Sequence, residues 1–181
     1  KFDGRYEPNL VGTNEFLDFT ELCGAEPYIA ANITSTTPLN IRDWVDYCNS
    51  PAGTTTMARM REANGRKEPF NVKLWGIGNE EIFSQDRPET IRTTITMRQE
   101  VRKLDDTRPI TSAVVCWNGI ERFDTAQKYI PVTKELDVMG VNYCKTAWDD
   151  YHEQMPKQPV IITEARSNSG TRGCYSTQEE K

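Results

Sequence analysis

Five short apolar runs alternate along the chain with segments of helical periodicity, and this alternation limits the possible folds more than any other feature. The runs occupy residues 27–32, 72–78, 110–116, 137–142 and 159–164. Several of them are rich in Val and Ile and are bounded by turn-forming residues, which is typical of strands buried in a parallel sheet. Repeated strand–helix units predict an α/β fold built on such a sheet.

Between the runs, apolar residues recur at the i, i+3, i+4, i+7 spacing of an amphipathic helix. This spacing predicts helices over residues 14–23, 41–48, 57–63, 88–104, 120–130 and 148–155. We expect their apolar side chains to face the sheet. In the first helix and in helix 88–104 these are Phe16, Phe19, Leu22, Cys23, Ile91, Ile95, Val101 and Leu104.

Composition excludes several classes of function. The 181 residues carry a formal net charge of −5 with mixed signs, so a basic face for nucleic acid is not expected. No apolar stretch approaches the roughly 20 residues that span a bilayer. The five cysteines are widely spaced and only one histidine is present, which argues against a zinc site and a disulfide framework. We expect no metal or organic cofactor, and Cys23 and Cys48 should be buried.

Acidic residues end two of the apolar runs. Asn79 and Glu80 close the run 72–78, and Glu164 closes the run 159–164. The carboxyl ends of parallel strands meet at one edge of a sheet, which is where open α/β sheets bind their ligands. Two carboxylates facing one cleft are the groups that cleave glycosidic bonds. The sequence therefore predicts a glycoside-hydrolase site at this edge.

Two known families resemble different parts of the chain. Residues 7–80 resemble the family 51 α-L-arabinofuranosidases, in the segments 7–17, 23–30, 44–49 and 63–76. Residues 78–175 are similar to family 2, the β-galactosidase group, in the segments 78–81, 103–113, 137–143, 151–153, 159–164 and 169–173. The two likenesses join at Asn79-Glu80, which suggests an engineered or recombined chimera; a natural intermediate family would also account for it.

The resemblance implies a (β/α)₈ TIM-type barrel, the fold of both families. The five strand–helix units match strands three to seven of that barrel, so we expect residues 1–181 to form a single barrel domain that is incomplete, with truncation at both ends left open. The resemblance further implies a retaining mechanism, with the acid/base after strand four and the nucleophile after strand seven. These positions correspond here to Glu80 and Glu164.

Four further residues are candidates for substrate binding. By resemblance, Asn79 is expected to bind the sugar 2-hydroxyl, and Tyr143 to donate a hydrogen bond to the nucleophile. Trp117 and Asn118 follow the run 110–116 and offer a stacking face and a polar contact for a sugar ring. Each of the four also has a structural interpretation, as a loop cap or as part of the core.

These observations lead to a retaining glycoside hydrolase that cleaves a terminal glycosidic bond by double displacement, with carbohydrate as its partner. The segment that carries Glu164 favours a β-galactosidase-like substrate, and an α-L-arabinofuranosidase-like activity is the alternative. A non-catalytic barrel, engineered or fragmentary, is a second alternative, and its open sheet edges would favour a homo-oligomer. A remnant that binds sugar without cleaving it is a third.

Overall fold

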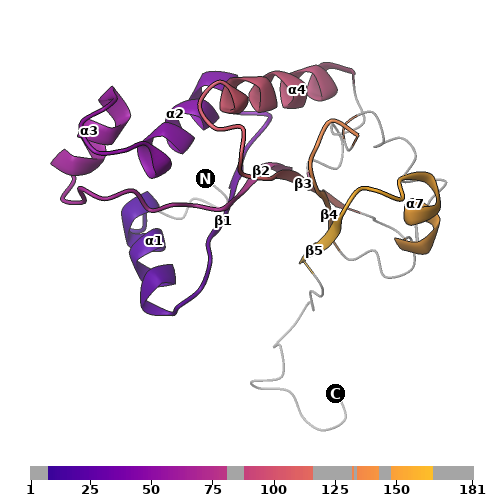
Figure 1. The fold of residues 1–181 in the computed structure, drawn as a ribbon, viewed down its shortest axis with the longest axis horizontal. Helices are drawn as coiled ribbons and strands as arrows, with labels where there is room; N and C mark the ends of the chain where they lie inside the picture. The colour runs from indigo at the N-terminus through magenta and orange to yellow at the C-terminus, as the bar shows by residue number, and fades with distance from the viewer. Residues whose placement is uncertain (1–7, 81–87, 116–131, 133, 143–147, 165–181) are drawn as a thin grey trace, which may run out of the picture.

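A computed structural model describes residues 8–80, 88–115, 132, 134–142 and 148–164, and shows one five-stranded parallel sheet with helices packed against it (Figure 1). The strands follow one another in the sheet in their order along the chain. This confirms the predicted α/β fold and is compatible with an incomplete barrel. The strands are β1 (Tyr28–Ala31), β2 (Leu74–Asn79), β3 (Ile110–Val115), β4 (Met139–Asn142) and β5 (Val160–Glu164).

The helices agree with the predicted segments wherever the structure describes them. Helices α2 and α3 connect β1 to β2, α4 connects β2 to β3, and α7 connects β4 to β5; α2 and α4 pack side by side on the same side of the sheet (Figure 1). The helix predicted at 120–130 lies outside the described residues. In the described part of the chain, no helix is long and apolar enough to cross a membrane. The helices are α1 (Thr13–Leu22), α2 (Pro38–Asn49), α3 (Thr56–Ala63), α4 (Pro88–Arg102) and α7 (Trp148–Gln154).

The core lies between the sheet and helices α2 and α4. Trp75 of β2 is fully buried and meets Trp44 of α2 edge to face, with ring centroids 6.2 Å apart. Cys48 of α2 is also fully buried, as predicted. Burial raises the pKa of this thiol to about 12, against a smaller opposite effect of the neighbouring Arg61 guanidinium.

The long connection between α2 and β2 is organised by one buried cation. Arg61 of α3 is fully buried and donates hydrogen bonds to the carbonyl oxygens of Tyr47 at 2.6 Å, Ser50 at 2.9 Å and Lys67 at 3.0 Å. These carbonyls belong to the end of α2 and to the loops on either side of α3. Because one side chain satisfies all three, it fixes the connection against α2.

The predictions of inward-facing side chains were wrong at several positions. In α1, Leu17 is the buried residue, whereas Phe19 and Leu22 are 63% and 87% exposed and Cys23 is exposed. The helical spacing was correct, but spacing alone does not say which side of a helix meets the core. Leu104 is exposed because α4 ends at Arg102. Phe16 is also largely exposed at 39%, Ile91 and Ile95 are half-buried, and Thr94, Met97 and Val101 are the buried residues of α4.

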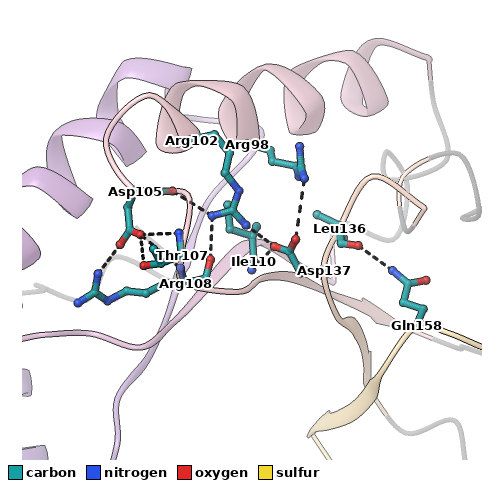
Figure 2. Close-up of polar contacts among 9 residues, drawn as sticks. All are labelled: Arg98, Arg102, Asp105, Thr107, Arg108, Ile110, Leu136, Asp137 and Gln158. Carbon is teal, nitrogen blue, oxygen red and sulfur yellow. Dashed lines mark hydrogen bonds and ion pairs between the residues drawn. The ribbon is translucent and has the colours of Figure 1, made fainter.

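At the amino ends of β3 and β4, a polar network joins α4 to the sheet (Figure 2). The Asp137 carboxylate accepts hydrogen bonds from the backbone N–H of Ile110 at 2.7 Å and from the Arg102 guanidinium. Arg102 also donates to the carbonyl oxygens of Asp105 at 3.0 Å and Arg108 at 2.8 Å. The network therefore holds the turn between α4 and β3 in place.

Asp105 is the most perturbed carboxyl group of this network. Burial acts to raise its pKa, but hydrogen bonds from Thr107 and Arg108 outweigh that effect and lower the pKa to about 2. The contacts are 2.7 Å from the Thr107 hydroxyl and 2.6 Å from the Arg108 guanidinium (Figure 2). This end of the sheet is thus occupied by interactions that stabilise the fold.

Candidate active site

The site begins with an irregularity in β2. Between β2 and β3, Gly76 pairs with Thr111 and Asn79 pairs with Ala113, so β2 contains one extra residue. Gly78 has φ +83° and Glu80 has φ +55°, and the Glu80 N–H donates to the Ala113 carbonyl at 3.0 Å. A bulge of this kind bends a strand and redirects the side chains that follow it. Here it redirects Asn79 and Glu80.

A second irregularity lies in β5, next to the other candidate carboxylate. Val141 pairs with Ile162, and Asn142 pairs with Glu164, so Thr163 is the extra residue. Two residues of β5 therefore lie opposite Asn142. Both irregularities are at the carboxyl ends of their strands, and each directly precedes or includes a candidate residue.

Asn142, at the end of β4, joins the two candidate carboxylates. Its side-chain Nδ2 lies 2.9 Å from Glu80 Oε1 and 3.2 Å from Glu164 Oε2. Asn79 Oδ1 lies 3.4 Å from the same nitrogen. The Thr163 hydroxyl lies 2.5 Å from Asn142 Oδ1. Asn142 is fully buried, whereas both glutamates are half-buried and thus remain accessible from solvent.

These contacts limit the separation of the carboxylates. Glu80 Oε1 and Glu164 Oε2 both touch one nitrogen, so they are at most about 6 Å apart. In a flat sheet, β2 and β5 would be separated by three strand spacings, about 14 Å. The two side chains therefore lean toward each other across β3 and β4, and the curvature of a barrel would favour such convergence. An upper limit of this size on one pair of oxygens includes the ~5–5.5 Å separation of the carboxyl groups in retaining glycosidases.

The structure brings together three of the six predicted site residues, which are Asn79, Glu80 and Glu164. Tyr143, Trp117 and Asn118 lie outside the described residues. Asn142 and Thr163 also contribute contacts to this site but were not among the predicted site residues. A polar residue that ends a buried apolar run was the available signal for Asn142, as it had been for Asn79.

Among the residues that the structure describes, there is no group of three or more His, Cys, Asp or Glu side chains that could hold a metal ion. The site offers carboxylates, amides and a hydroxyl. These groups can transfer protons, attack an electrophilic carbon and bind sugar hydroxyls.

The chain is similar to known proteins both in sequence and in structure. A probable alpha-L-arabinofuranosidase C of Aspergillus flavus is 47% identical over 74 residues, which are 41% of this chain and 14% of that protein. The alpha-L-arabinofuranosidase of Thermotoga maritima, solved as an arabinose complex, has a TM-score of 0.63 at 27% identity, and the match covers 76% of this chain and 29% of that one. The matched segments are thus a small part of longer proteins.

The predicted likeness to family 51 is also found in these comparisons. Solved family 51 arabinofuranosidases match the chain. A family 2 glycoside hydrolase of Bacteroides cellulosilyticus matches with 25% identity and a TM-score of 0.45, over 60% of this chain and 13% of that one. A family model described as the alpha-L-arabinofuranosidase 1 domain matches residues 3–118, which continues the first likeness well past Glu80. Because this match spans more than half of the 181 residues, the chain belongs to the alpha-L-arabinofuranosidase 1 domain family.

Proposed function

We propose that this chain carries the catalytic pair of a retaining glycoside hydrolase that acts on terminal α-L-arabinofuranosides. The observation that supports the proposal is the contact of Glu80 and Glu164 with one amide nitrogen, which keeps the two carboxylates within about 6 Å. That limit supports the retaining mechanism, in which the carboxyl groups lie ~5–5.5 Å apart and one of them acts as the nucleophile.

In the first step, a Glu164 carboxylate oxygen attacks the anomeric carbon, and the bond from that carbon to the leaving oxygen breaks. Glu80 gives its proton to the leaving oxygen, and a glycosyl ester forms on Glu164. In the second step, the Glu80 carboxylate takes a proton from water, the water oxygen attacks the anomeric carbon, and the ester bond breaks. Two displacements on the same carbon return the original configuration.

The comparisons favour the alternative prediction, an arabinofuranosidase, over the β-galactosidase-like activity that was predicted first. The family model includes the acid/base candidate Glu80, and both the Aspergillus and the Thermotoga proteins are named arabinofuranosidases. The prediction of a β-galactosidase-like activity is still supported by the motifs in residues 78–175. Asn79 is placed next to Glu80 and, in this proposal, binds the 2-hydroxyl of the sugar, where a hydrogen bond strengthens in the transition state.

The test compares hydrolysis of p-nitrophenyl α-L-arabinofuranoside and p-nitrophenyl β-D-galactopyranoside by the 181-residue chain. We expect turnover of the first substrate, and Glu80→Gln should lower kcat by about 10²–10⁴-fold, because attack of water on the glycosyl ester needs its general base. Glu164→Gln should abolish turnover, because no covalent intermediate can form. Glu153→Gln, an exposed change on α7, serves as the matched control and should leave the rate unchanged.

The stereochemistry of the product provides an independent check. Proton NMR of the sugar released at early times should show the anomer of the substrate, as double displacement requires. The opposite anomer would refute the retaining mechanism. Turnover of the galactoside alone would refute the choice of sugar. Absence of turnover of both substrates by the folded chain would favour the non-catalytic alternative.

A further inference from the structure

We infer that Asn142 is a positioning residue. Its side-chain amide donates hydrogen bonds to both carboxylates and fixes their relative position, and the Thr163 hydroxyl donates to the amide oxygen and fixes the amide. The catalytic consequence of this inference rests on the proposed function, but the hydrogen-bonded unit itself does not. The unit consists of Glu80, Asn142, Thr163 and Glu164, from the ends of three strands.

The Asn142 amide has two N–H donors for three nearby acceptors, of which Asn79 Oδ1 is the most distant at 3.4 Å. An Asn side chain has two N–H donors on Nδ2, and the two shortest acceptor distances from Nδ2 are those to Glu80 and Glu164. One N–H group is therefore available for each carboxylate. Because the amide does not titrate, it can hold both carboxylates without passing a proton between them.

The orientation of the amide follows from what each neighbour can accept or donate. An ionised carboxylate only accepts hydrogen bonds, so Nδ2 and not Oδ1 must face the glutamates. Oδ1 then faces Thr163, whose hydroxyl is able to donate to it. The reversed amide would place a carbonyl oxygen against two carboxylates and would lose both hydrogen bonds.

The β5 irregularity explains why Thr163 reaches the amide. In a regular strand, Thr163 and Glu164 would point to opposite faces of the sheet. The extra residue places both of them opposite Asn142. Asn142 is fully buried, so its side chain has little freedom to leave this position.

During the proposed reaction, Glu80 alternates between acid and carboxylate, and Glu164 alternates between carboxylate and ester. An oxygen of each group can accept an N–H from Asn142 in every one of these states. The amide therefore keeps the distance between the two groups constant through both displacements. Loss of such positioning by about 1 Å costs on the order of 10²-fold in rate.

The kinetic test uses a matched pair at Thr163 and one isosteric change at Asn142. Thr163→Val keeps the shape of the side chain but removes the hydroxyl, and we expect kcat to fall about tenfold with a smaller change in KM. Thr163→Ser keeps the hydroxyl and should restore kcat to within about threefold of the original. Asn142→Asp removes both donors, and we expect kcat to fall by about 10²-fold or more.

The split between kcat and KM separates positioning from a merely structural role. Because the Thr163 hydroxyl donates to the Asn142 amide oxygen, its loss in Thr163→Val should lower the kcat of the folded chain while KM changes less. A change that only destabilised the fold would lower the melting temperature without lowering kcat at temperatures at which the chain is folded.

Side-chain amide NMR tests the unit independently of hydrolysis. The Asn142 Nδ2 protons, assigned by their loss in Asn142→Asp, should change chemical shift in Glu80→Gln and in Glu164→Gln but not in the control Glu153→Gln. If the wild type hydrolyses no glycoside but both substitutions move the amide signals, the proposed function fails and the hydrogen-bonded unit stands. If hydrolysis occurs but neither substitution moves the amide signals and Thr163→Val keeps wild-type kinetics, the unit is refuted.

Discussion

Replacement of Arg61 by Met tests whether one buried side chain organises the α2–β2 connection. Arg61→Met keeps much of the side-chain volume and removes the guanidinium, which donates to the carbonyl oxygens of Tyr47, Ser50 and Lys67. Hydrogen bonds from a charged donor contribute about 1.5–3 kcal/mol each, so the gross loss is roughly 5–9 kcal/mol. The buried guanidinium has itself lost its hydration, at a cost of several kcal/mol, and the substitution removes that cost.

The two effects leave a net destabilisation of about 2–4 kcal/mol for Arg61→Met. Arg59→Met is the matched control, because Arg59 lies on the same helix, is exposed and makes one contact, with the Gly53 carbonyl at 3.2 Å. We expect the control to cost less than about 0.5 kcal/mol. The free energy of unfolding from urea denaturation, followed by circular dichroism, measures both changes. Equal effects of the two substitutions would refute the role assigned to Arg61.

Three further changes test other parts of the structure. Asp105 has its pKa lowered to about 2, so its contribution to stability is complete above its unfolded value near 3.8 and is lost as pH falls toward 2. Urea denaturation should therefore show that the free energy of unfolding falls by about 1–2 kcal/mol from pH 6 to pH 2.5 because of Asp105, and this part of the fall should be absent in Asp105→Asn. Cys48 is buried and has its pKa raised to about 12, so it should resist iodoacetamide at pH 8, whereas the exposed Cys23 should react. Peptide mass mapping distinguishes the two cysteines, and modification of Cys48 in the folded chain would contradict its burial. Gly140→Ala should lower the free energy of unfolding by about 1–3 kcal/mol, because the new Cβ would lie 2.6 Å from the Ser112 carbonyl oxygen, a backbone atom that cannot easily move. An unchanged melting temperature would contradict this clash.

Much of the fold could be predicted from the sequence, because the strands are short apolar runs bounded by turn-forming residues. The runs 27–32, 110–116 and 159–164 each became a strand within one or two residues of the prediction. The order of the strands follows the rule that strands which follow one another along the chain usually lie next to each other in the sheet. The direction in which α1 faces could not be predicted, because its apolar residues are spaced for a helix whichever side meets the sheet.

The candidate site could be predicted only in part, for a related reason. Glu80 and Glu164 were found because a residue that directly follows a buried parallel strand must lie at the carboxyl edge of the sheet. The roles of Asn142 and Thr163 depend on an extra residue in β5, and strand alternation in the sequence gives the opposite expectation for Thr163. A one-residue irregularity changes which side chains meet but leaves the apolar pattern almost unchanged.

The two ends of the sheet differ in how they use hydrogen bonds. At the amino end, Asp137 and Arg102 satisfy backbone groups of the α4–β3 turn and of β3, and thereby stabilise the fold. At the carboxyl end, both pairing irregularities occur, and Glu80 adopts a left-handed φ of +55°, which costs a non-glycine residue about 1–2 kcal/mol. A glycine at position 80 would avoid that cost but would supply no carboxylate. Strained backbone persists only where the surrounding structure holds it in place and is common at functional sites, so the φ of Glu80 favours a functional role for this residue.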